Sequence, residues 1–153
     1  MGLANLTVII IEWETILTLQ LIVILFVIAL LHFYWAFGGK KGLNLSVPSK
    51  EDGTLLFLPN SFQCALVGFG LLLVILFIYL GMRQLVFSNW VFKNGLLILG
   101  GIFMLRSVGD LNYVGFFKKV KATDFGKLDT KYYSPLCLLI SGTFFLIANT
   151  IQP

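Results

Sequence analysis

The chain has 153 residues, of which 58% are hydrophobic and 12% are charged, and its formal net charge is +4. A soluble domain usually carries about 25% charged and 45–50% apolar residues, so this composition excludes an ordinary water-soluble domain. A helical bundle in lipid is the natural alternative, because it satisfies every backbone polar group within the chain. We therefore predict an all-α integral membrane protein that forms a single transmembrane domain over residues 1–153.

The first predicted span covers about residues 15–37 and contains the single histidine of the chain near its end. Its roughly 23 residues exceed the roughly 20 that cross the hydrocarbon core. Ionisable groups at membrane depth are costly and therefore indicate function, and histidine is the side chain that most often serves as an acid or a base in a site, so His32 is a candidate for that role. The same ring can instead donate one hydrogen bond to a neighbouring helix. Tyr34 and Trp35 are candidate ligand contacts, although such aromatic residues also anchor spans at the interface.

Two further spans are bounded by residues that favour helix starts. The second, about residues 62–82, follows Asn60 and Ser61, either of which is a favourable N-cap. The fourth, about residues 135–151, starts at Ser134-Pro135, which combines a cap with a proline at the first helical position. With the first and third spans they make a four-helix transmembrane bundle.

The third predicted span, about residues 90–111, carries the charged residues of greatest interest. Arg106, Asp110 and Tyr113 are spaced by four and three residues, so they share one face if the helix continues that far. Arg106 and Asp110 can then pair within one helix, which lowers the cost of either charge near lipid. Tyr113 is predicted to bond to Asp110 or to point at a ligand. An interfacial anchor, with Arg106 extending toward the headgroups, explains the same residues equally well.

The loop after the third span mixes aromatic residues with lysines between Phe116 and Tyr133. Such a segment suits the headgroup layer of a membrane, where its lysines attract anionic lipids. Asp129 in this loop is predicted to cap a helix or pair with the lysines, or alternatively to face a pocket together with Asp110.

The distribution of basic residues predicts the orientation of the bundle. The first loop holds three lysines and the third holds five, whereas the second has one arginine and one lysine and the two terminal segments have none. The positive-inside rule therefore places the first and third loops in the cytoplasm and both termini on the outer side. Because the lysines lie beside membrane spans, we expect membrane lipids as partners and no nucleic acid.

No residue pattern predicts a metal or a cofactor. Cys64 and Cys137 have no ligand spacing and are read as small buried apolar residues. A lone histidine excludes a haem held by two histidines, and no cysteine or carboxylate stands beside His32 at the spacing of a zinc or di-iron site.

Four segments resemble a family of small bacterial membrane proteins of unknown function, of about 150 residues. The segments are residues 31–39 (LHFYWAFGG), 105–118 (LRSVGDLNYVGFFK), 125–130 (FGKLDT) and 133–136 (YSPL). The resemblance implies four spans, a bacterial inner (cytoplasmic) membrane and no assigned activity. It also marks a set of positions at the end that the charges place in the cytoplasm: His32, Trp35, Arg106, Gly109, Asp110, Tyr113 and Asp129.

Three functions remain open from the sequence. The leading hypothesis is a polar pocket at the cytoplasmic end that binds or moves a small molecule or lipid, lined by His32, Tyr34, Trp35, Arg106, Asp110 and Tyr113. An alternative is an intramembrane enzyme that uses His32 and Asp110 for acid–base chemistry on a lipid-soluble substrate. A second alternative is a structural subunit, a homo-oligomer or part of a complex, because a span with several charges prefers protein neighbours to lipid.

Overall fold

The computed structural model describes residues 3–152, with side chains from residue 13 onward, and within this range it contains helices and no strand. Four helices are long and apolar enough to cross a membrane, and their candidate spans are Trp13–Ala36, Ser61–Met82, Asn89–Val108 and Asp124–Thr150. The prediction of an all-α membrane protein with four spans is therefore confirmed.

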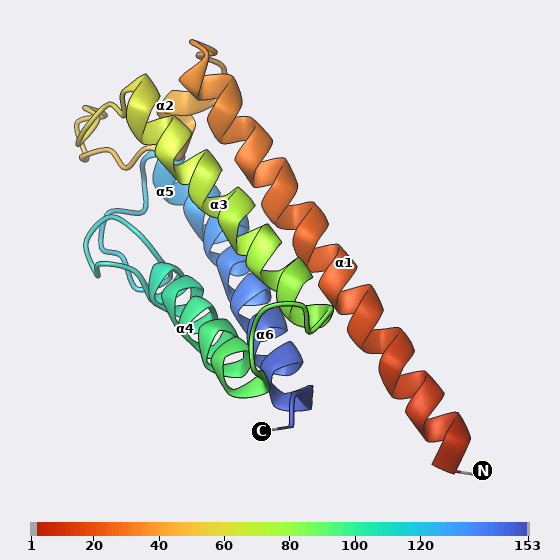
Figure 1. Cartoon of the computed structure of the whole chain (residues 1–153). Coiled ribbons are helices and arrows are strands. Elements are labelled where there is room, and N and C mark those ends of the chain that lie inside the picture. The colour runs from red at the N-terminus through yellow and green to blue at the C-terminus, as the bar shows by residue number, and fades with distance from the viewer. Residues whose placement is uncertain (1–2, 153) are drawn as a thin grey trace.

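The first, second and third spans are α1 (Leu3–Ala36), α3 (Ser61–Met82) and α4 (Asn89–Val108). The fourth joins three segments end to end: α5 (Asp124–Leu128), the π-helical η1 (Asp129–Tyr133) and α6 (Ser134–Thr150). A single short helix, α2 (Leu43–Ser46), lies in the first loop. The start of α1 and the end of α6 lie at one end of the bundle, and the first and third loops lie at the other (Figure 1).

The helices pack mainly as two pairs, α1 along α3 and α4 along α6. A common core joins the pairs through buried side chains of all four helices, namely Leu21, Leu25, Ile78, Phe92, Leu96, Ile140, Phe144, Ile147 and Ala148. Small residues permit the close approach of α4 and α6, because the Phe145 ring lies against Gly100 and the Ser141 hydroxyl donates to the Gly100 carbonyl at 2.8 Å.

The third span ends earlier than predicted. α4 stops at Val108, and the next residue, Gly109, has φ 87° and ψ −168°, a backbone conformation that no helix continues. The N–H of Gly109 donates to the carbonyl of Leu105 and closes the helix. Asp110 therefore lies in the loop that follows, and it does not share a helix face with Arg106.

The fourth span begins earlier than predicted, because Ser134 is not an N-cap. Ser134 has helical angles, φ −67° and ψ −43°, and the helix starts instead behind Thr123, whose hydroxyl accepts from the N–H of Gly126. Pro135 has no N–H to donate four residues back. The chain accommodates this proline with a π turn, in which the N–H of Ser134 donates to the carbonyl of Asp129, five residues back.

Candidate functional site

The most unusual feature of the molecule is a carboxylate buried at the loop end of the bundle. Asp129 is fully buried and accepts three hydrogen bonds. One oxygen accepts from an Arg106 guanidinium nitrogen at 3.0 Å, and the other accepts from the ammonium of Lys118 at 2.9 Å and from the N–H of Gly115 at 2.8 Å. Asp129 is thus joined to α4 through Arg106 and to the third loop through Gly115 and Lys118. We call Arg106, Lys118 and Asp129 the charge cluster.

Lys118 is buried as completely as Asp129, with 1% of the residue exposed. Its three N–H donors are all used, by the Asp129 carboxylate, by the Gly115 carbonyl at 2.9 Å and by the Thr130 hydroxyl at 2.7 Å. The Thr130 hydroxyl in turn donates to the carbonyl of Gly126 at 3.0 Å. A buried ammonium is tolerable only with such complete pairing, because isolated buried charge is very costly.

Arg106 is the member of the cluster that reaches the surface. About a third of its side chain is exposed, 36%, whereas the side chains of Lys118 and Asp129 are at 0%. Its inner Nη1 atom and the hydroxyl of Ser134 are buried without a hydrogen-bond partner among the described residues. Two cations against one carboxylate leave the cluster with a formal surplus of one positive charge.

Asp110 holds the start of the third loop and does not pair with Arg106, so the predicted Arg106–Asp110 ion pair is wrong. One oxygen of Asp110 accepts the backbone N–H groups of Asn112, Tyr113 and Val114 at 2.7–2.9 Å. Partial burial alone raises the pKa of this carboxyl, but these three N–H groups outweigh burial and hold the pKa below its ordinary value of 3.8. The described hydrogen bond from Tyr113 to Asp110 comes from the backbone N–H of Tyr113, and not from the side chain that the prediction concerned.

Two glycines close the loop that Asp110 begins. Gly109 and Gly115 have φ of 87° and 89°, and a Cβ on either would collide with the backbone of the segment around the other. Only glycine fits these positions without strain. The N–H of Phe116 then donates to the carbonyl of Ser107 at 2.9 Å, so the loop returns to the end of α4.

The aromatic and histidine positions of α1 hold the turn that leaves this helix. The Nδ1 atom of His32 lies 2.8 Å from the carbonyl oxygen of Ile28, and the imidazole packs edge-on against Trp35 with ring centroids 5.2 Å apart. The indole N–H of Trp35 donates to the carbonyl of Lys41 at 3.1 Å, and the Tyr34 hydroxyl accepts from the Lys41 N–H at 3.4 Å. The hydrogen bond of His32 stays within its own helix, and no described hydrogen bond or ion pair joins His32 to the charge cluster.

Lys118, Gly115 and Thr130 were not singled out by the sequence analysis. The sequence did offer a pairing of Asp129 with lysines of its loop, and Lys118 is the lysine that fulfils it. Nothing in the spacing distinguishes Lys118 from the four other lysines between Phe116 and Tyr133, all of which are exposed.

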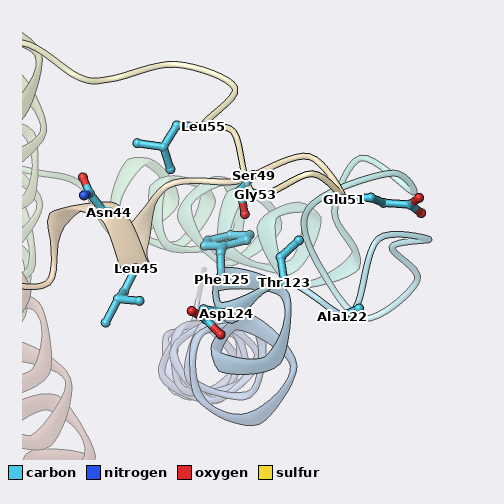
Figure 2. A pocket seen from close by; sticks show the side chains of 10 residues that line it. All are labelled: Asn44, Leu45, Ser49, Glu51, Gly53, Leu55, Ala122, Thr123, Asp124 and Phe125. Carbon is cyan, nitrogen blue, oxygen red and sulfur yellow. The ribbon is translucent and has the colours of Figure 1, made fainter.

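Two hollows accompany the site. The first, of about 390 Å³, lies between the first loop and the start of α5, where the Phe125 ring lies beneath Ser49 and Gly53 (Figure 2). The second, of about 480 Å³, runs along α6. Neither is lined by any residue predicted to line the pocket: His32, Tyr34, Trp35, Arg106, Asp110 or Tyr113. In the part of the chain with described side chains, no group of three or more histidine, cysteine or acidic side chains is placed to hold a metal ion.

Comparison with known proteins gives one match. A family described as "Protein of unknown function (DUF3995)" matches residues 25–144. The matched region begins within α1, ends within α6 and contains the whole charge cluster. No curated protein and no solved structure matches the chain.

Proposed function

We propose that this chain, which belongs to the DUF3995 family of unknown function, is a membrane-embedded binding protein for a lipid or other amphiphile with an anionic headgroup. The observation that carries the proposal is the charge cluster with its single surplus positive charge and its single surface-reaching member, Arg106. The phosphate chemistry of such a headgroup suits a guanidinium, whose planar donors match phosphate and carboxylate oxygens.

The pairing within the cluster supports Arg106 as the ligand-binding residue. Lys118 has no free donor, because its three N–H groups are taken by protein oxygens. Asp129 binds one edge of the guanidinium and so orients it, which makes Asp129 a positioning residue. Exposed lysines of the third loop and of the start of the fourth span, among them Lys119, Lys121, Lys127 and Lys131, add a favourable field for an anion. Tyr34, Trp35 and Tyr113 remain candidate contacts for the rest of the ligand.

The proposal includes an orientation and a location. We place the first and third loops, and therefore Arg106, on the cytoplasmic side of a bacterial cytoplasmic membrane, with both termini outside. The lysine distribution supports this placement. A cysteine introduced at Lys121 in a variant without Cys64 and Cys137 should react with a membrane-impermeant maleimide only after permeabilisation, and a tag on either terminus should be accessible on intact cells. The reverse pattern would contradict the orientation.

The test of binding is native mass spectrometry of the purified protein after exchange into defined lipid. We expect wild-type protein to retain phosphatidylglycerol over phosphatidylcholine, and Arg106→Gln to lose about tenfold or more of that preference, as expected for a hydrogen bond to a charged group. Arg83→Gln is the matched control, because Arg83 is an exposed arginine directly after α3, at the opposite end of the bundle. Arg106→Lys keeps the charge and reports whether the guanidinium geometry matters.

Competition with inorganic phosphate separates a lipid from a free anion. Displacement of the lipid by millimolar phosphate would indicate a soluble anionic ligand, whereas resistance to phosphate supports a headgroup attached to a lipid. Equal retention of both lipids by wild-type protein would refute the proposal. The acid–base alternative built on His32 and Asp110 and the structural-subunit alternative stay predictions, because no contact described above favours either.

A further inference from the structure

A groove on the lipid side of α6 is independent of the charge cluster. It has a volume of about 480 Å³, within the range of small-molecule sites. We call it the α6 groove, and its walls come from one face of α6, from two residues of α1 and from Phe116. The lining residues are Leu17, Gln20, Phe116, Pro135, Leu138, Leu139, Gly142, Thr143 and Leu146.

The α6 groove lies at hydrocarbon depth at its outer end. Gln20 is seven residues inside the start of its span at Trp13, and Thr143 is seven residues before the end of its span at Thr150. At 1.5 Å per residue, both lie roughly 10 Å inside the ends of their candidate spans. The hydrocarbon core is about 30 Å thick, so the two polar side chains are below the headgroups and among acyl chains.

Gln20 is polar and unpaired at this depth. Its side chain is exposed, and its amide makes no hydrogen bond with the described residues. The Thr143 hydroxyl already donates to the carbonyl of Leu139 at 2.9 Å, so it offers a neighbour only lone pairs. An amide in hydrocarbon without a partner is unfavourable. The α6 groove therefore combines apolar walls with a free donor and free acceptors.

We infer that the α6 groove binds a neutral, membrane-soluble molecule with an apolar body and a hydroxyl group, which Gln20 holds by hydrogen bonding. A hydroxyl can accept from the Gln20 amide and donate to an oxygen of Gln20 or Thr143, so it satisfies both the free donor and the free acceptors of the α6 groove. An ordinary acyl chain leaves the amide unpaired.

Photolabelling in lipid nanodiscs tests this inference. The probe is a long-chain alcohol that carries a diazirine on its chain, and the comparison probe is the same chain without the hydroxyl. We expect the alcohol to label peptides that contain residues 17–20 and 138–146, and the hydroxyl-free chain to label them several-fold less. Gln20→Leu, which keeps the volume and removes the amide, should reduce labelling by the alcohol about 3- to 10-fold, the effect of one hydrogen bond.

A pair of glycines supplies a steric test with a matched control. A Cβ on Gly142, in the α6 groove, or on Gly101, on α4, meets no atom within 4 Å, so both positions accept a side chain. Gly142→Leu should fill the α6 groove and abolish labelling there, whereas Gly101→Leu should leave labelling unchanged. Arg106→Gln should also leave it unchanged, which separates this inference from the proposed headgroup site.

Three results would overturn the inference. Equal labelling by both probes with no effect of Gln20→Leu would mean that bulk acyl chains occupy the α6 groove. Equal labelling of wild type and Gly142→Leu would mean that the probe does not enter it. A change from oligomer to monomer in Gly142→Leu, measured by light scattering in detergent, would identify a second copy of the chain as the occupant.

Discussion

The first loop, residues 37–60, and the third loop, residues 109–123, cover the same end of the bundle but are held by different kinds of interaction (Figure 1). The first loop relies mainly on hydrogen bonds at exposed positions, such as Thr54 to Asp52 and the reciprocal pair of Asn60 and Gln63. Its hydrogen bond with the fourth span, from the Tyr133 hydroxyl to the Leu45 carbonyl at 3.4 Å, is exposed too. The third loop is tied to α4 and to the fourth span by buried charges.

This difference indicates which of the two loops is restricted to fewer conformations. Exposed local bonds contribute little each, because water competes for the same groups. A buried ion pair with all donors used tolerates few alternative arrangements, since any other one leaves a charge unpaired at low dielectric. The third loop therefore has one geometry, and that geometry positions Arg106. The predictions below test whether the two loops differ as their contacts indicate.

The largest effect is expected from Asp129→Asn. This change keeps the volume but leaves Lys118 buried without a counter-charge, and removal of one partner of a buried pair typically costs about 3–5 kcal/mol. Unfolding of the purified protein by a denaturing detergent, followed by circular dichroism, measures the loss. Asp124→Asn is the control in the same helix, because its pair with Lys127 is exposed, and it should cost no more than about 0.5 kcal/mol. Similar losses of stability in the two variants would contradict the inferred difference between the buried ion pair of Asp129 and the exposed pair of Asp124.

A smaller effect is expected from two glycines with positive φ, one in each loop. Gly115→Ala should cost about 2 kcal/mol or more, because the new Cβ meets both a positive φ of 89° and the backbone of Val108 and Gly109. Gly42→Ala in the first loop has a similar φ of 79° but open space around it, so it should cost only about 1 kcal/mol. The same detergent titration measures both, and equal costs would show that the backbone contact in the third loop is unimportant.

The sequence predicted more of the spans than of the site, and the reason is the range over which each is decided. A span is a local property of about 20 apolar residues, and the cap at Asn60 is decided by four residues, so both can be predicted from the local sequence. The partner of Arg106 is decided by where α4 ends and by the π turn before Pro135. Gly109 ends the helix one residue before Asp110, and this end places Asp110 in the loop.

The residue that does pair with Arg106 lies 23 positions away. Its place depends on the packing of α4 against the fourth span, which spacing along the chain does not encode. The identity of the buried lysine has the same origin. Asp129 was predicted to pair with a lysine of its loop or to face a pocket, and only the fold selects Lys118 over its exposed neighbours.

The helix caps provide an internal control on the comparison, with effects of about 1 kcal/mol. Asn60 caps α3 from the first loop, and Thr123 caps α5 from the third, each by accepting one backbone N–H. Because both are local bonds, Asn60→Ala and Thr123→Ala should destabilise the protein equally, as judged by the detergent midpoint. A much larger loss for Thr123→Ala would show that the whole third loop, and not the charge cluster alone, is the more stable region.

The smallest effect concerns acid. Asp110 in the third loop and Asp52 in the first both have a pKa held below the ordinary value of 3.8, Asp52 by hydrogen bonds from Thr54 and Asp110 by backbone N–H groups that outweigh its partial burial. A folded-state pKa below the unfolded one adds stability that is complete above the unfolded pKa and disappears as the pH falls through the folded pKa. The detergent concentration at the unfolding midpoint should therefore decrease as the pH is lowered below about 4. This decrease should be smaller in Asp110→Asn and in Asp52→Asn than in wild type. Because Asp52 is fully exposed, Asp52→Asn should change the pH dependence of the midpoint less than Asp110→Asn does. An equal or larger change in Asp52→Asn would mean that the three backbone hydrogen bonds of Asp110 do not distinguish the two loops.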